Sequence, residues 1–169
     1  MEDDEERQHI KLAVAGIEEL TGAPPVGWFS GRPSVNTRRL LVEQGGFLYD
    51  RDYLGDELPF WVKSGDRDHL VIAYSLETNH NRFDRNTGFS TAEEFAQYMI
   101  DGFDRLYEEG AERPKIISVA LHDRLIGRPA KAVGLIRFLD HVREHDRVWL
   151  CTGRDIAEHW RRAHPPGDI

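Results

Sequence analysis

Short apolar runs alternate with helical patterns along almost the whole chain, and this alternation restricts the fold more than any other feature. Five runs have the apolar, partly β-branched character of buried strands, at residues 26–29, 47–49, 70–74, 115–121 and 148–151. Parallel neighbouring strands need a helical crossover, which is almost always right-handed. The alternation therefore predicts an α/β fold with about five mainly parallel strands. A doubly wound sheet and an incomplete barrel both satisfy it.

The helical patterns between these runs start and stop at recognisable signals. Ser90-Thr91-Ala92-Glu93 is a capping-box signature, and the apolar stripe behind it, from Phe95 to Leu106, is the strongest in the chain. Further patterns predict helices over residues 5–20 and 36–43 and from residue 155 onward. Another helix is predicted over residues 130–145, with four apolar side chains facing inward: Val133, Ile136, Leu139 and Val142.

Length and composition narrow the class of protein. The chain has 169 residues, so we expect a single domain over residues 1–169. Its net charge of −8 argues against nucleic acid or an anionic membrane surface as a partner, and leaves a small uncharged or cationic substrate open. Cys151 is the only cysteine, so no internal disulfide is expected. No signal-peptide pattern and no membrane-spanning apolar run is present, so we expect a cytoplasmic protein.

Polar residues follow every predicted strand, where parallel α/β folds gather their active groups. The five segments are Ser30-Gly31-Arg32, Asp50-Arg51-Asp52, Glu77-Thr78-Asn79-His80, His122-Asp123-Arg124 and Thr152-Gly153-Arg154. Strand ends are polar in any α/β protein because they meet water, so each segment alone is only suggestive.

His122 is the sharpest candidate for chemistry, because it follows an apolar run at the rim of the predicted sheet. An imidazole there can protonate a leaving nitrogen or oxygen near neutral pH, although a structural hydrogen-bonding role is also open. Arg32 and Arg124 can hold a carbonyl, carboxylate or ureido group through paired donors, or form surface ion pairs. Glu77 and Asn79 can orient His122 or a polar substrate.

The histidines do not form a recognisable metal motif. His80 and His122 follow separate strands without a spaced ligand set. His141 and His145 share a helix face at i, i+4 but lack a third ligand in the sequence pattern, so solvated helix histidines are expected there. Nucleotide-binding glycine loops and a serine nucleophile elbow are also missing from the sequence, so we expect neither a metal nor a cofactor.

Several longer motifs carry a family resemblance that extends over residues 8–161. They are Gly27-Trp28-Phe29-Ser30-Gly31-Arg32, Asn36-Thr37-Arg38-Arg39, Gly45-Gly46-Phe47-Leu48-Tyr49-Asp50, Leu58-Pro59-Phe60-Trp61, Tyr74-Ser75-Leu76-Glu77-Thr78-Asn79 with Arg82-Phe83, Ala111-Glu112-Arg113-Pro114-Lys115, Leu121-His122-Asp123-Arg124-Leu125-Ile126-Gly127-Arg128-Pro129, Phe138-Leu139-Asp140-His141, Asp155-Ile156-Ala157 and Trp160. In order and density they resemble polysaccharide deacetylases of the allantoinase-like branch.

The resemblance implies part of a distorted (β/α)7 barrel that hydrolyses an amide or ester bond. It gives His122 the role of general acid and places Arg32 at the substrate-side arginine motif, with Trp28 and Arg124 as further substrate-binding candidates. Glu77 and Asn79 fall where other deacetylases carry an aspartate that tunes the histidine. This departure favours a ureide substrate, as in purine catabolism, over chitin or peptidoglycan.

The front of the family's fold has no counterpart in the sequence. Family members begin with strands that bear an Asp-Asp pair and, in metal-dependent members, a His-x-x-x-His motif, whereas this chain begins at the helix that follows. Hydrolysis needs a group that activates water, and a barrel without its first strands leaves unpaired edges. We therefore expect a partner chain or a homo-oligomer to supply what is missing. The alternative is a non-catalytic remnant that binds a small molecule.

Overall fold

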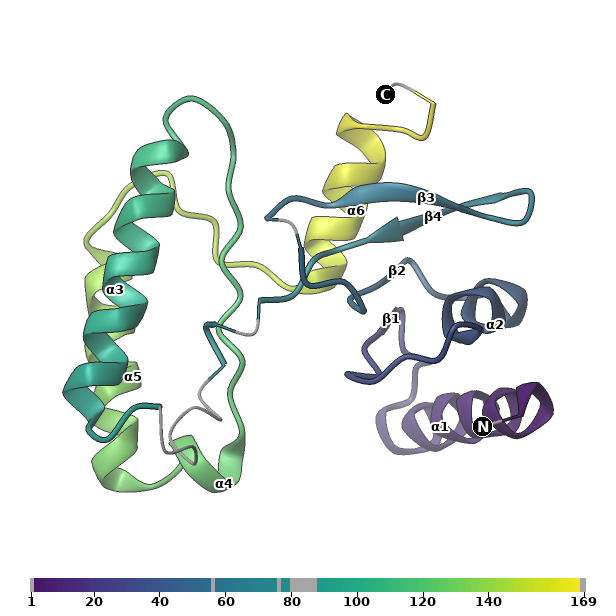
Figure 1. Cartoon of the computed structure of the whole chain (residues 1–169), viewed down its shortest axis with the longest axis horizontal. Coiled ribbons are helices and arrows are strands. Elements are labelled where there is room, and N and C mark those ends of the chain that lie inside the picture. Colours follow the sequence, from purple (N-terminus) through teal and green to yellow (C-terminus); the bar gives the residue numbers. More distant parts are fainter. Residues whose placement is uncertain (1, 56, 76, 80–87, 168–169) are drawn as a thin grey trace. The chain divides into compact units, whose positions relative to one another are not determined.

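The computed structural model describes residues 2–55, 57–75, 77–79 and 88–167 (Figure 1). The elements are α1 (Asp3–Thr21), β1 (Gly27–Trp28), α2 (Thr37–Gln44), β2 (Tyr49–Asp50), β3 (Phe60–Ser64), β4 (Arg67–Val71), α3 (Ala92–Glu109), α4 (Asp123–Ile126), α5 (Pro129–Arg143) and α6 (Gly153–Ala163). By their contacts they divide into two compact units, Met1–Tyr74 with Cys151–Ile169 (unit 1) and Ser75–Leu150 (unit 2). The single domain expected from length stays a prediction.

Unit 1 contains a four-stranded sheet in the order β1-β2-β4-β3. Strands β1, β2 and β4 are parallel, as the alternation predicted, with Gly27 opposite Tyr49 and Tyr49 opposite Leu70. Strand β3 is antiparallel to β4, and a tight turn at Gly65, with φ of +61°, joins the two. The sheet is therefore mixed. The sequence pattern missed β3 because only three apolar residues precede its polar end.

Two of the predicted strands do not form. Residues 115–121 and 148–151 lie outside regular strands, and in the described part of unit 2 one isolated parallel bridge joins Asn79 to Ala120. An apolar run becomes a strand only where a neighbour pairs with its backbone groups. The α/β class is confirmed, with fewer strands than the apolar runs indicated. None of the helices in the described residues is long and apolar enough to cross a membrane.

Buried side chains join α1 to α2 in unit 1. Ile10 packs against Leu40 and Leu41 in a small apolar cluster. The Glu6 carboxylate is buried beside this cluster and accepts hydrogen bonds from Ser34 Oγ at 2.6 Å and from the Thr37 hydroxyl. The buried charge therefore has partners at the start of α2, as a buried carboxylate requires.

Tyr49 in β2 explains why glycine occupies two positions of unit 1. A Cβ on Gly27 would lie 2.3 Å from the Tyr49 ring, and one on Gly153 would lie 2.1 Å from its hydroxyl oxygen. No real Cβ approaches another atom that closely, so β1 and the first turn of α6 reach Tyr49 only because both residues lack a side chain. Burial raises the pKa of the Tyr49 hydroxyl.

Helices α3 and α5 lie side by side and form the core of unit 2 (Figure 1). Their shared cluster includes Phe95, Met99, Phe103, Phe138 and Val142. A capping box starts α3, but one residue later than the predicted Ser90–Glu93 pattern: the Thr91 hydroxyl accepts from Glu94 N and the Glu94 carboxylate accepts from Thr91 N.

The buried face of α5 differs from the predicted one. Val142 is buried as expected, but Val133, Ile136 and Leu139 are 41%, 56% and 41% exposed, whereas Gly134 and Phe138 are buried. Gly134 lets α5 approach α3 so closely that a Cβ there would lie 2.5 Å from the Ala92 carbonyl oxygen. The close approach at Gly134 and the large Phe138 ring fix the rotation of α5, which apolar spacing alone did not reveal.

Candidate functional site

The carboxyl ends of β1, β2 and β4 meet at one edge of the unit 1 sheet, because the three strands are parallel. Backbone hydrogen bonds continue past the strands, from Arg51 N to Trp28 O and from Tyr74 N to Tyr53 O, both at 2.9 Å. The Phe29 and Tyr74 rings pack with centroids 4.6 Å apart. Residues that follow β1 and β2 are therefore held in fixed positions at this edge.

Asp52 fixes the loop that carries Arg32. Its carboxylate accepts hydrogen bonds from Ser30 N at 3.1 Å and Gly31 N at 3.0 Å, and also from the Ser30 hydroxyl. Gly31 has φ of +68°, a left-handed conformation that favours glycine. The Arg32 side chain is exposed at the end of this loop. The role of Arg32 in binding substrate stays a prediction. The structure adds that the backbone of its loop is held by Asp52.

Asp50 is the most enclosed charged group among the described residues of unit 1. Its side chain is 1% exposed; Arg38 donates to it through Nε at 2.7 Å and Nη2 at 3.0 Å, and His69 Nε2 lies 3.1 Å from it. Burial opposes ionisation of the carboxyl group, but the hydrogen bonds from His69 and Arg38 outweigh it and lower the pKa of Asp50 to about 2. The same pairing raises the pKa of Arg38.

A cavity of about 130 Å³ lies beside this ion pair. Its lining residues are Pro33, Ser34, Val35, Thr37, Arg38, Leu41, Asp50 and Asp52. Asp50 and Asp52 were not singled out as site residues in the sequence. Their signal was an Asp-x-Asp pattern at a strand end, which does not by itself distinguish structural from catalytic carboxylates.

Trp28 lies in the core of unit 1. It is half-buried and packs edge-on against Phe47 with ring centroids 5.6 Å apart, beside the cluster formed by α1 and α2. Its buried Nε1 has no hydrogen-bond partner among the residues that the structure describes. A donor with an unmet partner is compatible with contact to a ligand, so substrate binding by Trp28 stays a prediction.

The segment that holds Glu77 and Asn79 runs parallel to residues 118–120 in unit 2. The Thr78 hydroxyl donates to Ser118 O at 2.5 Å, and Ala120 N donates to Thr78 O at 3.3 Å. Asn79 pairs with Ala120, two residues before His122. Asn79 lies on one of two neighbouring parallel segments and His122 follows the other, and the role of Asn79 in orienting His122 stays a prediction. His80 and Arg82-Phe83 lie outside the described residues.

His122 precedes the short helix α4 in extended backbone conformation and is half-buried. Its carbonyl oxygen accepts from the backbone N–H groups of Leu125 and Ile126, both at 3.0 Å, and these two side chains are buried. The imidazole thus extends from a turn that the core of unit 2 holds in place. Arg124 is exposed in the same turn. The structure groups Trp28 and Arg32 in unit 1 and Glu77, Asn79, His122 and Arg124 in unit 2.

Comparisons with known proteins decide the family. No protein-family model matches the sequence. A Schizosaccharomyces pombe protein described as a polysaccharide deacetylase is 36% identical over 177 aligned residues, which cover 95% of this chain and 55% of that protein. A crystal structure of a polysaccharide deacetylase from Pseudomonas aeruginosa matches 98% of the chain with a TM-score of 0.94 and 50% identity. The chain belongs to the polysaccharide deacetylase superfamily.

Other members of the superfamily show which branch and how much of the fold are represented. The crystal structure of PuuE allantoinase matches 98% of the chain with a TM-score of 0.94 and 47% identity, and the match covers 55% of that structure. The Helicobacter pylori peptidoglycan deacetylase is 24% identical over 95% of the chain. The chain spans between 55% and 65% of the curated relatives it matches. The resemblance to the allantoinase-like branch is confirmed.

Proposed function

We propose that this chain belongs to a hydrolase that cleaves a non-peptide carbon–nitrogen bond in a small amide or ureide. The observation that carries the proposal is the 47% identity to PuuE allantoinase over 98% of the chain. High identity along nearly the whole chain is stronger support for shared chemistry than a shared fold alone, because unrelated activities occur on the same barrel architecture. For such a hydrolase we propose purine breakdown as the pathway and the cytoplasm as the compartment.

His122 is the proposed general acid. Cleavage of a carbon–nitrogen bond is fast only when the leaving nitrogen receives a proton, and an imidazole can donate one near neutral pH. The turn between His122 and Ile126 is anchored in the core of unit 2, which limits the motion of the backbone that carries the ring. Asn79, which pairs with Ala120, is the proposed positioning residue on the neighbouring segment, together with Glu77.

Substrate binding is proposed for the arginines and Trp28. A ureide presents carbonyl oxygens in a plane, and a guanidinium group matches them with paired donors. Arg32 is exposed at the end of a loop that Asp52 holds, and Arg124 is exposed in the turn after His122. A net charge of −8 supports a small uncharged substrate rather than a polyanion.

Activation of water needs a base, and the two carboxylates at the edge of the unit 1 sheet are already committed. Asp50 is paired with Arg38 and His69, and Asp52 accepts three hydrogen bonds from Ser30 and Gly31. We propose that the base comes from outside this chain. Adjoining sequence or a partner chain can provide the part of the family's fold that this chain does not span, and in a homo-oligomer a second copy can provide a carboxylate of its own. Because Asp50 and Asp52 are both engaged in these contacts, a second candidate function is a binding subunit without turnover.

The experiment is a hydrolysis assay with complementation. The purified chain is assayed on allantoin and on N-acetylated sugars, alone and mixed with a polypeptide that carries the unmatched part of the PuuE allantoinase fold. The expected result is allantoin hydrolysis in the mixture. A stable complex that binds allantoin, shown by calorimetry, but never hydrolyses it would establish the binding subunit instead. No binding and no hydrolysis by a stable complex would overturn both candidates.

A further inference from the structure

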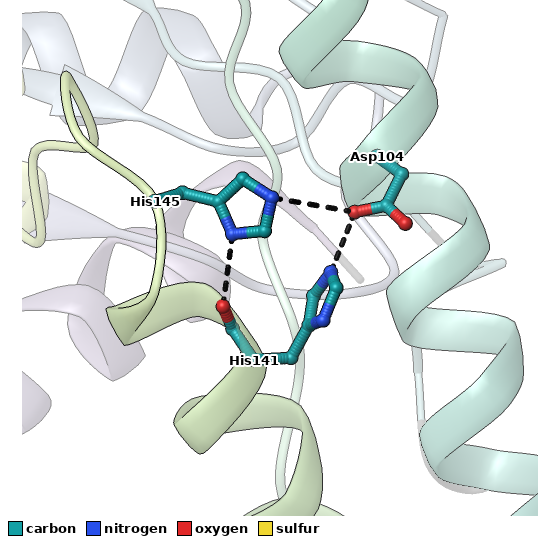
Figure 2. A group of neighbouring side chains, drawn as sticks. All are labelled: Asp104, His141 and His145. Carbon is teal, nitrogen blue, oxygen red and sulfur yellow. Dashed lines mark hydrogen bonds and ion pairs between the residues drawn. The ribbon is translucent and has the colours of Figure 1, made fainter.

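Three potential metal ligands converge between α3 and α5 in unit 2. Asp104 lies on α3, His141 lies in the last turn of α5, and His145 follows that helix (Figure 2). The packing of Phe103 against Phe138, with ring centroids 6.3 Å apart, sets the contact that brings the aspartate opposite the two histidines. The sequence showed two histidines without a third ligand. The fold supplies it from 37 residues earlier in the chain.

The spacing of the donor atoms is close to that of a metal site. His141 Nε2 lies 2.6 Å from Asp104 Oδ1, His145 Nε2 lies 4.0 Å from the same oxygen, and all three ligand atoms lie within 4.8 Å of one another. Zn²⁺ binds nitrogen and oxygen at about 2.0 to 2.2 Å in tetrahedral geometry, which places ligand atoms roughly 3.3 Å apart. Small rotations of partly exposed side chains bring the three atoms to that separation.

A backbone carbonyl fixes the orientation of His145. Its Nδ1 lies 2.9 Å from the His141 carbonyl oxygen, which can only accept, so Nδ1 carries a hydrogen (Figure 2). In the neutral imidazole Nε2 is then a lone-pair donor that faces the Asp104 carboxylate. The lone pair of His145 Nε2 and the carboxylate oxygens repel each other unless a proton or a metal cation lies between them. Metal-binding histidines are commonly oriented by a carbonyl on their other nitrogen.

Aromatic rings hold the imidazoles in place while the aspartate stays open to solvent. The His145 ring packs against Phe103 and Tyr107, with centroids 5.1 and 4.9 Å apart, and the His141 ring lies 5.8 Å from Phe103. The side chains of His141 and His145 are 26% and 24% exposed, whereas Asp104 is 45% exposed. An ion can therefore enter from the Asp104 side, and water can complete its coordination.

We propose that Asp104, His141 and His145 bind one divalent transition-metal ion, with Zn²⁺ as the best match to two imidazoles and a carboxylate. The ion would join α3 to α5 and so stabilise unit 2. Helix α5 has 15 residues and is therefore about 22 Å long. His122 precedes α5 in the chain, whereas the three ligands gather at its C-terminal end, so the proposed role is structural and lies beyond the hydrolytic function.

The first test is a calorimetric titration of the metal-free full chain with ZnCl₂. One ion per chain is expected, with affinity reduced at least about tenfold in each of His141→Ala, His145→Ala and Asp104→Asn, since even changes to groups that orient ligands cost that much. The matched controls are His9→Ala, an exposed histidine on α1, and Cys151→Ser, which removes the only thiol. Both should bind as tightly as the wild type.

A second measurement separates loss of the site from loss of the fold. Far-UV circular dichroism first establishes that each variant is folded. Zn²⁺ should then raise the melting temperature of the wild type and of both controls but not that of His145→Ala, because an ion stabilises only the state it binds. Equal Zn²⁺ affinity in the wild type and the His141→Ala/His145→Ala double variant would overturn the proposal. So would the absence of binding to the wild type at millimolar Zn²⁺.

Discussion

Two of the groups that the structure describes combine an aspartate with histidine, and they differ in burial. In unit 1, Asp50 is 1% exposed and is paired with Arg38 and His69. In unit 2, Asp104 is 45% exposed and faces His141 and His145. The residue types are similar, but the first group already contains a permanent cation, the Arg38 guanidinium. The second has only imidazoles beside the carboxylate and no permanent cation.

The difference shows how burial assigns a role to the same chemistry. A buried carboxylate is stable only with a permanent partner, and the partners that hold the pKa of Asp50 at about 2 also occupy its oxygens. Asp50 is therefore a structural residue, although it lies at the sheet edge where active groups gather. A half-exposed carboxylate needs no permanent partner, so Asp104 keeps the capacity to bind an ion.

The largest effect should come from removing the buried charge. Asp50→Asn leaves Arg38 without its counterion next to a buried histidine, and we expect the free energy of unfolding to fall by about 3 to 5 kcal/mol. The matched variant in the other group, Asp104→Asn, should cost less than about 1 kcal/mol in metal-free buffer, because exposed ion pairs contribute little. Urea denaturation measures both. Equal losses would break the comparison.

The pH dependence of stability should also come from Asp50. Its pKa is about 2 in the folded protein against 3.8 as the ordinary value. The ion pairs therefore contribute fully above about pH 4, and this contribution is lost as the pH falls from 4 toward 2. The loss is about 2 kcal/mol, since each pKa unit corresponds to about 1.4 kcal/mol. Carboxyl ¹³C chemical shifts during an acid titration measure the pKa directly, and a midpoint at 3.8 or above would contradict the assignment.

A smaller change in stability should come from the contact between α3 and α5 in unit 2. Gly134→Ala places a Cβ 2.5 Å from the Ala92 carbonyl oxygen, and the backbone must shift to relieve it. We expect a net loss of roughly 1 kcal/mol, after the gain in helix propensity is subtracted from the cost of overpacking. Gly16→Ala in α1 meets no atom within 4 Å and should stabilise the protein by up to about 1 kcal/mol. Thermal unfolding of the two variants measures the contrast, which disappears if α3 and α5 can separate freely.

Local sequence signals predicted the features that depend on neighbouring residues. A capping pattern placed the start of α3 to within one residue, and an apolar run placed His122 after an extended segment. The parallel pairing of the short strands followed from the alternation of strands and helices along the chain. The alternation also predicted the α/β class, and the family resemblance added the partial barrel, which the comparisons confirm.

Features that depend on packing between distant segments could not be predicted in this way. The rotation of α5 follows from the contact of Gly134 with α3, and apolar spacing gave three exposed residues as buried. The placement of Asp104 beside His141 follows from the same helix contact. The commitment of Asp50 to Arg38 and His69 depends on α2 and β4, which a pattern around residue 50 does not contain.

The most direct test of the proposed function concerns His122, which belongs to neither aspartate group. The measurement is kcat for allantoin in the complemented protein, with His122→Ala compared with the wild type and with His9→Ala. General acid catalysis contributes about 10² to 10⁴ in rate, so kcat should fall by that factor in His122→Ala and stay unchanged in His9→Ala. A His122→Ala protein that turns over allantoin at the wild-type rate would contradict the account.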